Sequence, residues 1–97
     1  MPYIKQERRE VLDKSINDLI FAIKSLPEDE LEGACNYTVT RVVVSSMKPS
    51  TGWRYNSLSR AHEVFKAAGA EMWDRLIRNY EDGARIRNGD LLEYKQF

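Results

Sequence analysis

The chain has 97 residues, of which 42% are hydrophobic and 31% are charged, and its 15 basic side chains balance its 15 acidic ones. This length predicts a single domain over residues 1–97 with a small core, because short chains bury only about 60–65% of their extended-chain surface. The zero net charge argues against a protein that coats nucleic acid. A single cysteine excludes an internal disulfide, so we expect self-association, as a dimer or tetramer, to add stability.

The sequence shows no targeting signal. No apolar run reaches the roughly 18 residues that a membrane-spanning helix needs, and no charged segment followed by an apolar one opens the chain. We therefore expect a cytoplasmic protein. Cys35 and His62 are the only residues of their kinds and do not supply the four ligands of a zinc site. We interpret Cys35 as a small buried residue, and we predict no metal, no cofactor, no catalytic residue and no enzymatic activity.

The first predicted helix spans residues 5–25. Its apolar side chains recur at the 3.6-residue period of a helix that buries one face; they are Leu12, Ile16, Leu19, Ile20, Ile23 and Leu26. Pro27 and the acidic residues after it predict a break and a new helix, because proline fits a first helical turn and acids suit the N-terminal end of the helix dipole.

The second predicted helix, at residues 28–47, contains an ambiguous segment. Residues 38–44 are rich in β-branched side chains, which favours a strand. Strict alternation fails at three consecutive valines, however, and no second strand-like run is present to pair with it. Apolar residues from Leu31 to Met47 keep helical spacing, so we predict a helix.

The third and longest predicted helix spans residues 56–80, after a loop at 48–52. Its apolar stripe is formed by Leu58, Ala61, Phe65, Ala68, Met72 and Leu76. Glu63 and Glu71 lie three and four residues before Lys66 and Arg75, a spacing that predicts ion pairs along the helix surface.

The C-terminal segment, residues 81–97, is predicted to be a turn-rich loop and tail, because it contains two glycines and the sequence Asn88-Gly89-Asp90. Leu91, Leu92, Tyr94 and Phe97 give this tail an apolar character. The fold class is therefore all-α: a small three-helix bundle of two shorter helices and one long helix, which associates with copies of itself.

Charge and aromatic residues point to a ligand. Residues 1–33 carry five basic and eight acidic side chains, whereas residues 34–88 carry nine basic and five acidic ones. The arginines of the second segment are interleaved with Trp53, Tyr55, Trp73 and Tyr80. Arginine binds phosphate through paired hydrogen bonds, and aromatic rings stack on bases. The pattern indicates a site for a phosphorylated, aromatic ligand; the alternative is a solvated arginine face with the aromatic rings packed between helices.

Several short motifs resemble those of a family of small proteins that is found widely in bacteriophages and in some prokaryotes. The motifs are Pro2-Tyr3-Ile4, Asn36-Tyr37, Tyr55-Asn56, Glu63, Glu71 with Trp73 and Arg75, Tyr80-Glu81-Asp82, and Asn88-Gly89-Asp90. The resemblance spans nearly the whole chain, and the closing Tyr-Glu-Asp and Asn-Gly-Asp motifs are its most specific part. This chain departs from the family at Arg60, where relatives tend to have glycine.

A phage origin implies a protein that binds something of the host. The chain looks like the compact oligomeric phage proteins that sequester cyclic dinucleotides made by cyclic-oligonucleotide-based antiphage signalling. The hypothesis is an anti-defence sponge, in the host cytoplasm, that binds a cyclic nucleotide such as cyclic GMP-AMP without cleaving it. Its expected ligand-binding residues are Tyr3, Trp53, Tyr55 and Tyr80 as stacking rings, Arg54, Arg75, Arg78 and Arg85 for the phosphates, and Asn88 and Asp90 for base or ribose edges.

Other functions remain open at this point. A small phage protein that blocks a host protein would bind no small molecule and would expose an apolar patch. A weak nucleic-acid binder would use the basic middle segment and show salt-dependent retention, although a nucleic-acid polymer is the less favoured partner. A hydrolase would need a metal site that the spacing of carboxylates does not provide.

Overall fold

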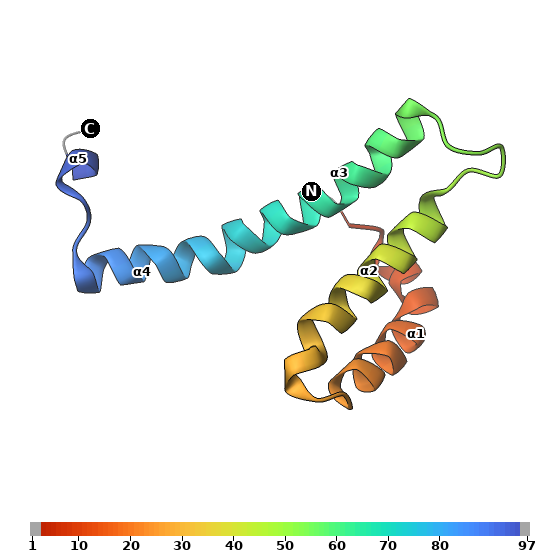
Figure 1. Cartoon of the computed structure of the whole chain (residues 1–97), viewed down its shortest axis with the longest axis horizontal. Helices are drawn as coiled ribbons and strands as arrows, with labels where there is room; N and C mark the ends of the chain where they lie inside the picture. Colours follow the sequence, from red (N-terminus) through yellow and green to blue (C-terminus); the bar gives the residue numbers. More distant parts are fainter. Residues whose placement is uncertain (1–2, 96–97) are drawn as a thin grey trace. The chain divides into compact units, whose positions relative to one another are not determined.

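A computed structural model describes residues 3–95 of the chain, and in that range 83% of the residues are helical and none is in a strand. The elements in chain order are α1 (Gln6–Lys24), the 3-10 turn η1 (Glu28–Glu30), α2 (Leu31–Met47), α3 (Tyr55–Met72), the π-helix η2 (Trp73–Ile77), α4 (Arg78–Asn88) and α5 (Leu92–Lys95) (Figure 1). The all-α class predicted from the sequence is confirmed.

The chain divides into two compact units, Met1–Ala61 and His62–Phe97. Unit 1 contains α1, η1, α2 and the first turns of α3, and unit 2 contains the rest of α3, η2, α4 and α5. The single-domain organisation over residues 1–97 stays a prediction, and Pro2 and Phe97, which the sequence analysis singled out, lie outside the described residues.

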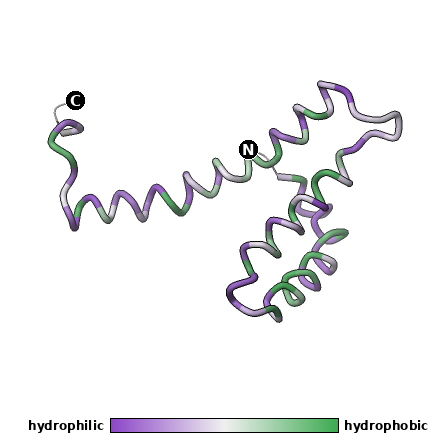
Figure 2. The backbone as a smooth tube through the Cα atoms, viewed as in Figure 1, coloured by the Kyte–Doolittle hydropathy of each residue, from purple (hydrophilic) through white to green (hydrophobic). Residues whose placement is uncertain are grey.

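Unit 1 is built on a helical hairpin in which α1 packs beside α2. Helix α1 ends at Ser25, whose hydroxyl donates a 2.6 Å hydrogen bond to the carbonyl of Ala22. Pro27 then starts η1 with an extended backbone (ψ 146°), and the amide of Glu30 donates to its carbonyl at 2.9 Å. The predicted break at Pro27 is thus confirmed. Figure 2 shows hydrophobic residues recurring along both helices of the hairpin.

Helix α2 confirms the helical interpretation of residues 38–44. A strand there would need a partner for its backbone groups, and no other described residue forms one; the helix satisfies those groups within the segment itself. The hydroxyl of Thr40 also donates to the side-chain oxygen of Asn36 at 3.3 Å. Cys35 in the same helix is exposed, so its interpretation as a buried residue is wrong.

The loop before α3 turns at Gly52, whose amide donates to the carbonyl of Pro49 at 3.0 Å. Gly52 has φ +93°, which a residue with a Cβ atom rarely adopts. At the start of α3 the hydroxyl of Ser57 accepts from the amide of Arg54 and donates to its carbonyl, both at 3.0 Å. These bonds fix the turn from which α3 leaves.

The chain stays helical in α4, so the loop predicted from residue 81 is wrong as far as Asn88. Two ion pairs at helical spacing support the helix here: Asp74 with Arg78 (i, i+4) and Asp82 with Arg85 (i, i+3). Their stabilising effect outweighs the low helix propensity of the glycine at position 83. Helix α4 ends where the Asn-Gly-Asp motif predicts a turn, at Gly89 with φ +86°. The tail beyond it forms the short helix α5.

Neither unit encloses a core. Ala61 is the one buried residue among those described, at 6% exposure. Large apolar side chains are more than a third exposed in both units, among them Leu12 and Ile16 of α1 and Leu76 of the π-helix. No helix in residues 3–95 has the length and apolar character that crossing a membrane requires.

Candidate ligand-binding site

A groove of about 430 Å³ on unit 2 contains two of the predicted phosphate-binding arginines. Trp73 contributes from the π-helix, and Arg78, Glu81, Asp82 and Arg85 contribute from α4. The α4 residues lie three, four and seven positions apart, so they share one face of the helix. The groove therefore places an indole ring and two guanidinium groups within reach of one small ligand.

Each predicted phosphate-binding arginine of unit 2 is paired with a carboxylate of its own helix. Arg75 Nε lies 2.6 Å from Glu71 Oε1, Arg78 lies 2.9 Å from Asp74 Oδ1, and Arg85 pairs with Asp82. The predicted pairs Glu63–Lys66, at 3.3 Å, and Glu71–Arg75 are both confirmed. Arg75, Arg78 and Arg85 are thus each matched by an acid along the helix.

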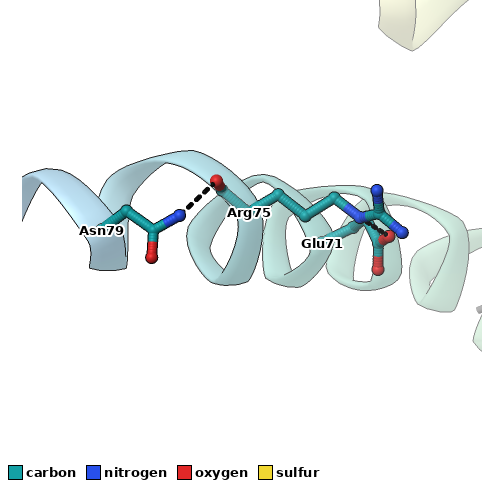
Figure 3. A network of polar contacts seen from close by, with 3 residues as sticks. All are labelled: Glu71, Arg75 and Asn79. Atoms are coloured by element: carbon teal, nitrogen blue, oxygen red, sulfur yellow. Dashed lines mark hydrogen bonds and ion pairs between the residues drawn. The ribbon is translucent and has the colours of Figure 1, made fainter.

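Arg75 also belongs to a line of three side chains that crosses the π-helix (Figure 3). Its guanidinium pairs with Glu71 one turn earlier, and its carbonyl accepts a 3.0 Å hydrogen bond from the side-chain amide of Asn79 one turn later. These contacts hold Arg75 along the helix axis. Arg75 does not line the groove of Trp73, Arg78 and Arg85.

The other predicted residues of unit 2 have different surroundings. The ring of Tyr80 is 68% exposed, and the guanidinium carbon of Arg87 lies 5.9 Å from its centroid, a cation–π arrangement. Asn88 is the last residue of α4. The carboxylate of Asp90 accepts a 2.8 Å hydrogen bond from the amide of Leu91, so it orders the entry to α5.

The predicted residues of unit 1 lie at two separate elements. Tyr3 lines an open apolar groove of about 490 Å³ together with Ile4, Leu12 and Ile16, and Arg9 lies 5.9 Å from its ring centroid. Trp53, Arg54 and Tyr55 instead form the entry to α3, where Tyr55 is 82% exposed and Trp53 is half-buried. The groove that Tyr3 lines is therefore not lined by Trp53, Arg54 or Tyr55.

Two features were not predicted from the sequence. Trp73 was treated as part of the aromatic pattern and not as a site residue, because no spacing rule indicates the π-helix from which it lines the groove of the α4 arginines. A second aromatic–arginine pair lies on α2, where Arg41 donates to the hydroxyl of Tyr37 at 3.3 Å and sits 5.7 Å from its ring. These two line a groove with Leu19 and Val42. Their i, i+4 spacing was the available signal.

No group of three His, Cys, Asp or Glu residues within 3–95 is arranged to hold a metal ion. The site is best described as an amphipathic groove with one aromatic ring and a balanced set of charges. A family defined by a domain of unknown function, DUF6899, matches residues 1–91, and the chain belongs to this family. Neither the curated proteins nor the solved structures include a match to this chain.

Proposed function

We propose that this protein is a binding protein that assembles from copies of itself and sequesters a cyclic dinucleotide, such as cyclic GMP-AMP, without cleaving it. In this proposal it acts against bacterial immune signalling, as a phage protein in the cytoplasm of the host cell. The observation that carries the proposal is the groove in which Trp73 lies with Arg78 and Arg85. A stacking ring and two phosphate-binding forks are what such a ligand requires.

The ion pairs of the groove are compatible with phosphate binding. Arg78 and Arg85 are each more than half exposed, and exposed ion pairs contribute only about 0–1 kcal/mol. A phosphate that takes both donors of a guanidinium fork forms stronger, charge-assisted bonds. Stacking of a base on an aromatic ring adds about 1–3 kcal/mol. A phosphodiester can therefore replace Asp74 or Asp82 as the partner of these arginines.

The carboxylates of the groove favour one kind of base. Glu81 and Asp82 line the same wall as the arginines and repel a ligand that brings only negative charge. A carboxylate accepts two hydrogen bonds, and guanine presents two neighbouring N–H donors on one edge. The proposal therefore specifies a guanine-containing ligand, whose base meets these acids while its phosphates meet Arg78 and Arg85.

The test is a thermal-shift and calorimetry panel of cyclic di- and trinucleotides with the purified protein. A ligand present at 100 times its dissociation constant adds about 2.7 kcal/mol of stability, which is a shift of several degrees for a chain of this size. We expect Arg78→Ala and Arg85→Ala each to weaken binding more than tenfold, and Arg8→Ala on α1 to leave it unchanged. Intact ligand released by heating supports sequestration.

Three results overturn the proposal or a part of it. No shift across the panel removes the cyclic nucleotide as the ligand. Recovery of a cleaved ligand identifies an enzyme instead of a sequestering protein. Equal affinity of the wild type and the double variant with both arginines replaced removes this groove as the site, even if a ligand binds.

A second candidate function is a protein-interaction module that blocks a host protein. The observation that favours it is the exposure of large apolar side chains in both units, such as Ile20 and Leu76. In that case the arginines serve only their intrahelical ion pairs. A stable complex with a host protein, in the absence of any cyclic nucleotide binding, decides for this candidate.

A further inference from the structure

A groove of about 270 Å³ on the helical hairpin of unit 1 takes no part in the proposed function. Helix α1 lies beside α2 there (Figure 1), and Leu19 of α1 forms one wall. The other lining residues come from α2 and share one face of it, since they are three or four positions apart; they are Tyr37, Thr38, Arg41, Val42 and Ser45. All of these residues belong to unit 1, so the groove lies within one compact unit.

The guanidinium of Arg41 is held in place and keeps most of its donors. Its Nη1 donates a 3.3 Å hydrogen bond to the hydroxyl of Tyr37, and its central carbon lies 5.7 Å from the centroid of the Tyr37 ring. A guanidinium has five N–H donors in a planar fork, and Tyr37 accepts from one nitrogen only. The rest of the fork makes no hydrogen bond within residues 3–95 and is available to a ligand in the groove.

No acid of the groove neutralises Arg41. The positions three and four residues away, where a helix places ion-pair partners, hold neutral side chains; they are Tyr37, Thr38, Val44 and Ser45. The whole segment 33–62 carries four basic side chains and no Asp or Glu. The groove of Trp73, by contrast, is lined by two carboxylates. The α2 groove therefore carries one positive charge that no lining residue cancels, and it attracts an anion.

Hydroxyl groups beside Arg41 indicate which anion fits. Thr38 lies one turn before Arg41, on the side toward which Arg41 reaches Tyr37, and its hydroxyl makes no hydrogen bond within the described residues. The Tyr37 hydroxyl accepts from Arg41 and keeps its own proton for a ligand. A guanidinium fork with two hydroxyls suits the three terminal oxygens of a phosphomonoester better than the two oxygens of a carboxylate.

The remaining lining leaves room for a small group attached to the phosphate. Leu19 and Val42 are 38% and 52% exposed, and Ser45 lies one turn beyond Arg41 on the same face. The volume is below the roughly 300–1,000 Å³ of most small-molecule sites. It suits one phosphate with the group next to it, which is smaller than a cyclic dinucleotide.

We infer that the groove of Tyr37, Thr38 and Arg41 is a second binding site, separate from the groove of Trp73, and that it takes a phosphomonoester group. Arg41 binds the phosphate through its fork, Thr38 and Tyr37 donate their hydroxyl protons to it, and Tyr37 also positions Arg41. The same chemistry is present in free phosphate and in a nucleoside monophosphate. The inference does not depend on the cyclic dinucleotide of the proposed function.

The test is a nuclear magnetic resonance titration of the isotope-labelled full chain with inorganic phosphate and with AMP at constant ionic strength. We expect the largest shifts at the amides of Tyr37 and Thr38 and at the side-chain Nε–H of Arg41. Adenosine, which has no phosphate, and acetate, which has a carboxylate, should bind more than tenfold more weakly. Tighter binding of AMP than of phosphate identifies an organic phosphomonoester as the ligand, and equal binding identifies free phosphate.

Two arginine variants separate the groove from general positive charge. Arg41→Met should weaken phosphate and AMP binding more than tenfold, and Arg41→Lys several-fold, because lysine keeps the charge but not the fork. Arg60→Met is the matched control and should leave binding unchanged. Arg60 belongs to the same acid-free segment, but it lines another groove with Ser46 and Ser57. Circular dichroism of each variant shows whether the helices are kept.

Several outcomes overturn the inference. They are the absence of shifts around Arg41 in the wild type at millimolar phosphate and AMP, equal losses in Arg41→Met and Arg60→Met, and adenosine or acetate binding as tightly as AMP. The wild-type shifts do not depend on any variant being folded.

The double variant Arg78→Ala with Arg85→Ala separates this inference from the proposed function. It should bind phosphate and AMP as the wild type does, because both substitutions lie outside the α2 groove. Loss of phosphate binding in this variant would place the phosphate in unit 2 and overturn the inference. Phosphate binding at Arg41 without any cyclic dinucleotide binding refutes only the proposed function.

Discussion

The two units of this protein obtain their structure in different ways. In unit 1, α1 and α2 pack against each other across the short connection that joins them, and residues such as Ile23 and Leu31 are half-buried. In unit 2 the contacts join consecutive turns, and the ion pairs span three or four residues. Helices in proteins owe most of their stability to packing of an apolar face. Unit 1 supplies part of that packing itself, whereas the helices of unit 2 are held mainly by interactions between neighbouring turns.

The largest effect that follows from this comparison is in the hydrogen exchange of the two units. Amides in residues 72–88 should exchange more than tenfold faster than those of α2, because the contacts of this segment join consecutive turns of one helical run. Amides of α2 should be better protected, because α1 packs beside them. Mass spectrometry of peptic fragments measures both. Equal exchange rates in the two segments would show that the packing of α1 against α2 adds no protection.

A smaller effect concerns the one buried side chain. Ala61→Asp should lower the free energy of unfolding by about 2–4 kcal/mol, because a carboxylate at a position with 6% exposure loses its hydration without gaining a partner. Ala70→Asp, on an exposed position of the same helix, should change it by less than about 1 kcal/mol. Urea unfolding at fixed protein concentration compares the two, and equal midpoints would mean that Ala61 is not part of a tertiary contact.

The smallest effect is expected at the glycines. Gly89→Ala should destabilise by about 1 kcal/mol, because Gly89 ends α4 with φ +86°, a conformation that alanine resists. Gly33→Ala in α2 should stabilise by about 0.5–1 kcal/mol, because the added Cβ has open space and alanine is the better helix former. Thermal unfolding gives both values. The same sign for the two substitutions would contradict the assigned end of α4.

The first helix of the hairpin and the break after it were predicted from the sequence, because the signals that specify them are local. The apolar period of residues 12–26 and the proline at position 27 are local signals, and the structure places α1 and the break where these signals indicate. The third helix was predicted too short, because glycine and Asn-Gly signals were given more weight than the ion pairs that continue α4 to Asn88. The Asn-Gly-Asp sequence correctly indicated a turn at Gly89, where α4 ends. Gly83 gave a turn signal of the same kind although it lies inside the helix.

The candidate site was less accessible to prediction. Arg78 and Arg85, which were predicted to bind phosphate together with Arg54 and Arg75, line one groove because seven residues is about two turns of a helix. Asp74 lies four residues before Arg78 and Asp82 three before Arg85, so these pairs also follow helical spacing, but the net charge of the whole segment does not reveal them. Trp73 was not selected, because no pattern in the sequence indicated the π-helix from which it lines the groove. The grouping of Tyr3 with the arginines was a hypothesis about assembly, and no local rule places residues from different units together.

The π-helix also has a consequence for how this family can vary. A single π-turn is what remains when a helix gains one residue and keeps its existing contacts on both sides. Relatives in which this segment is a plain α-helix should then be one residue shorter between the positions of Trp73 and Tyr80. The gain or loss of one residue within the π-helix would keep the directions in which the residues before and after it face. The same change within Tyr80–Ala84 would instead rotate every later residue of α4 by about 100° around the helix axis.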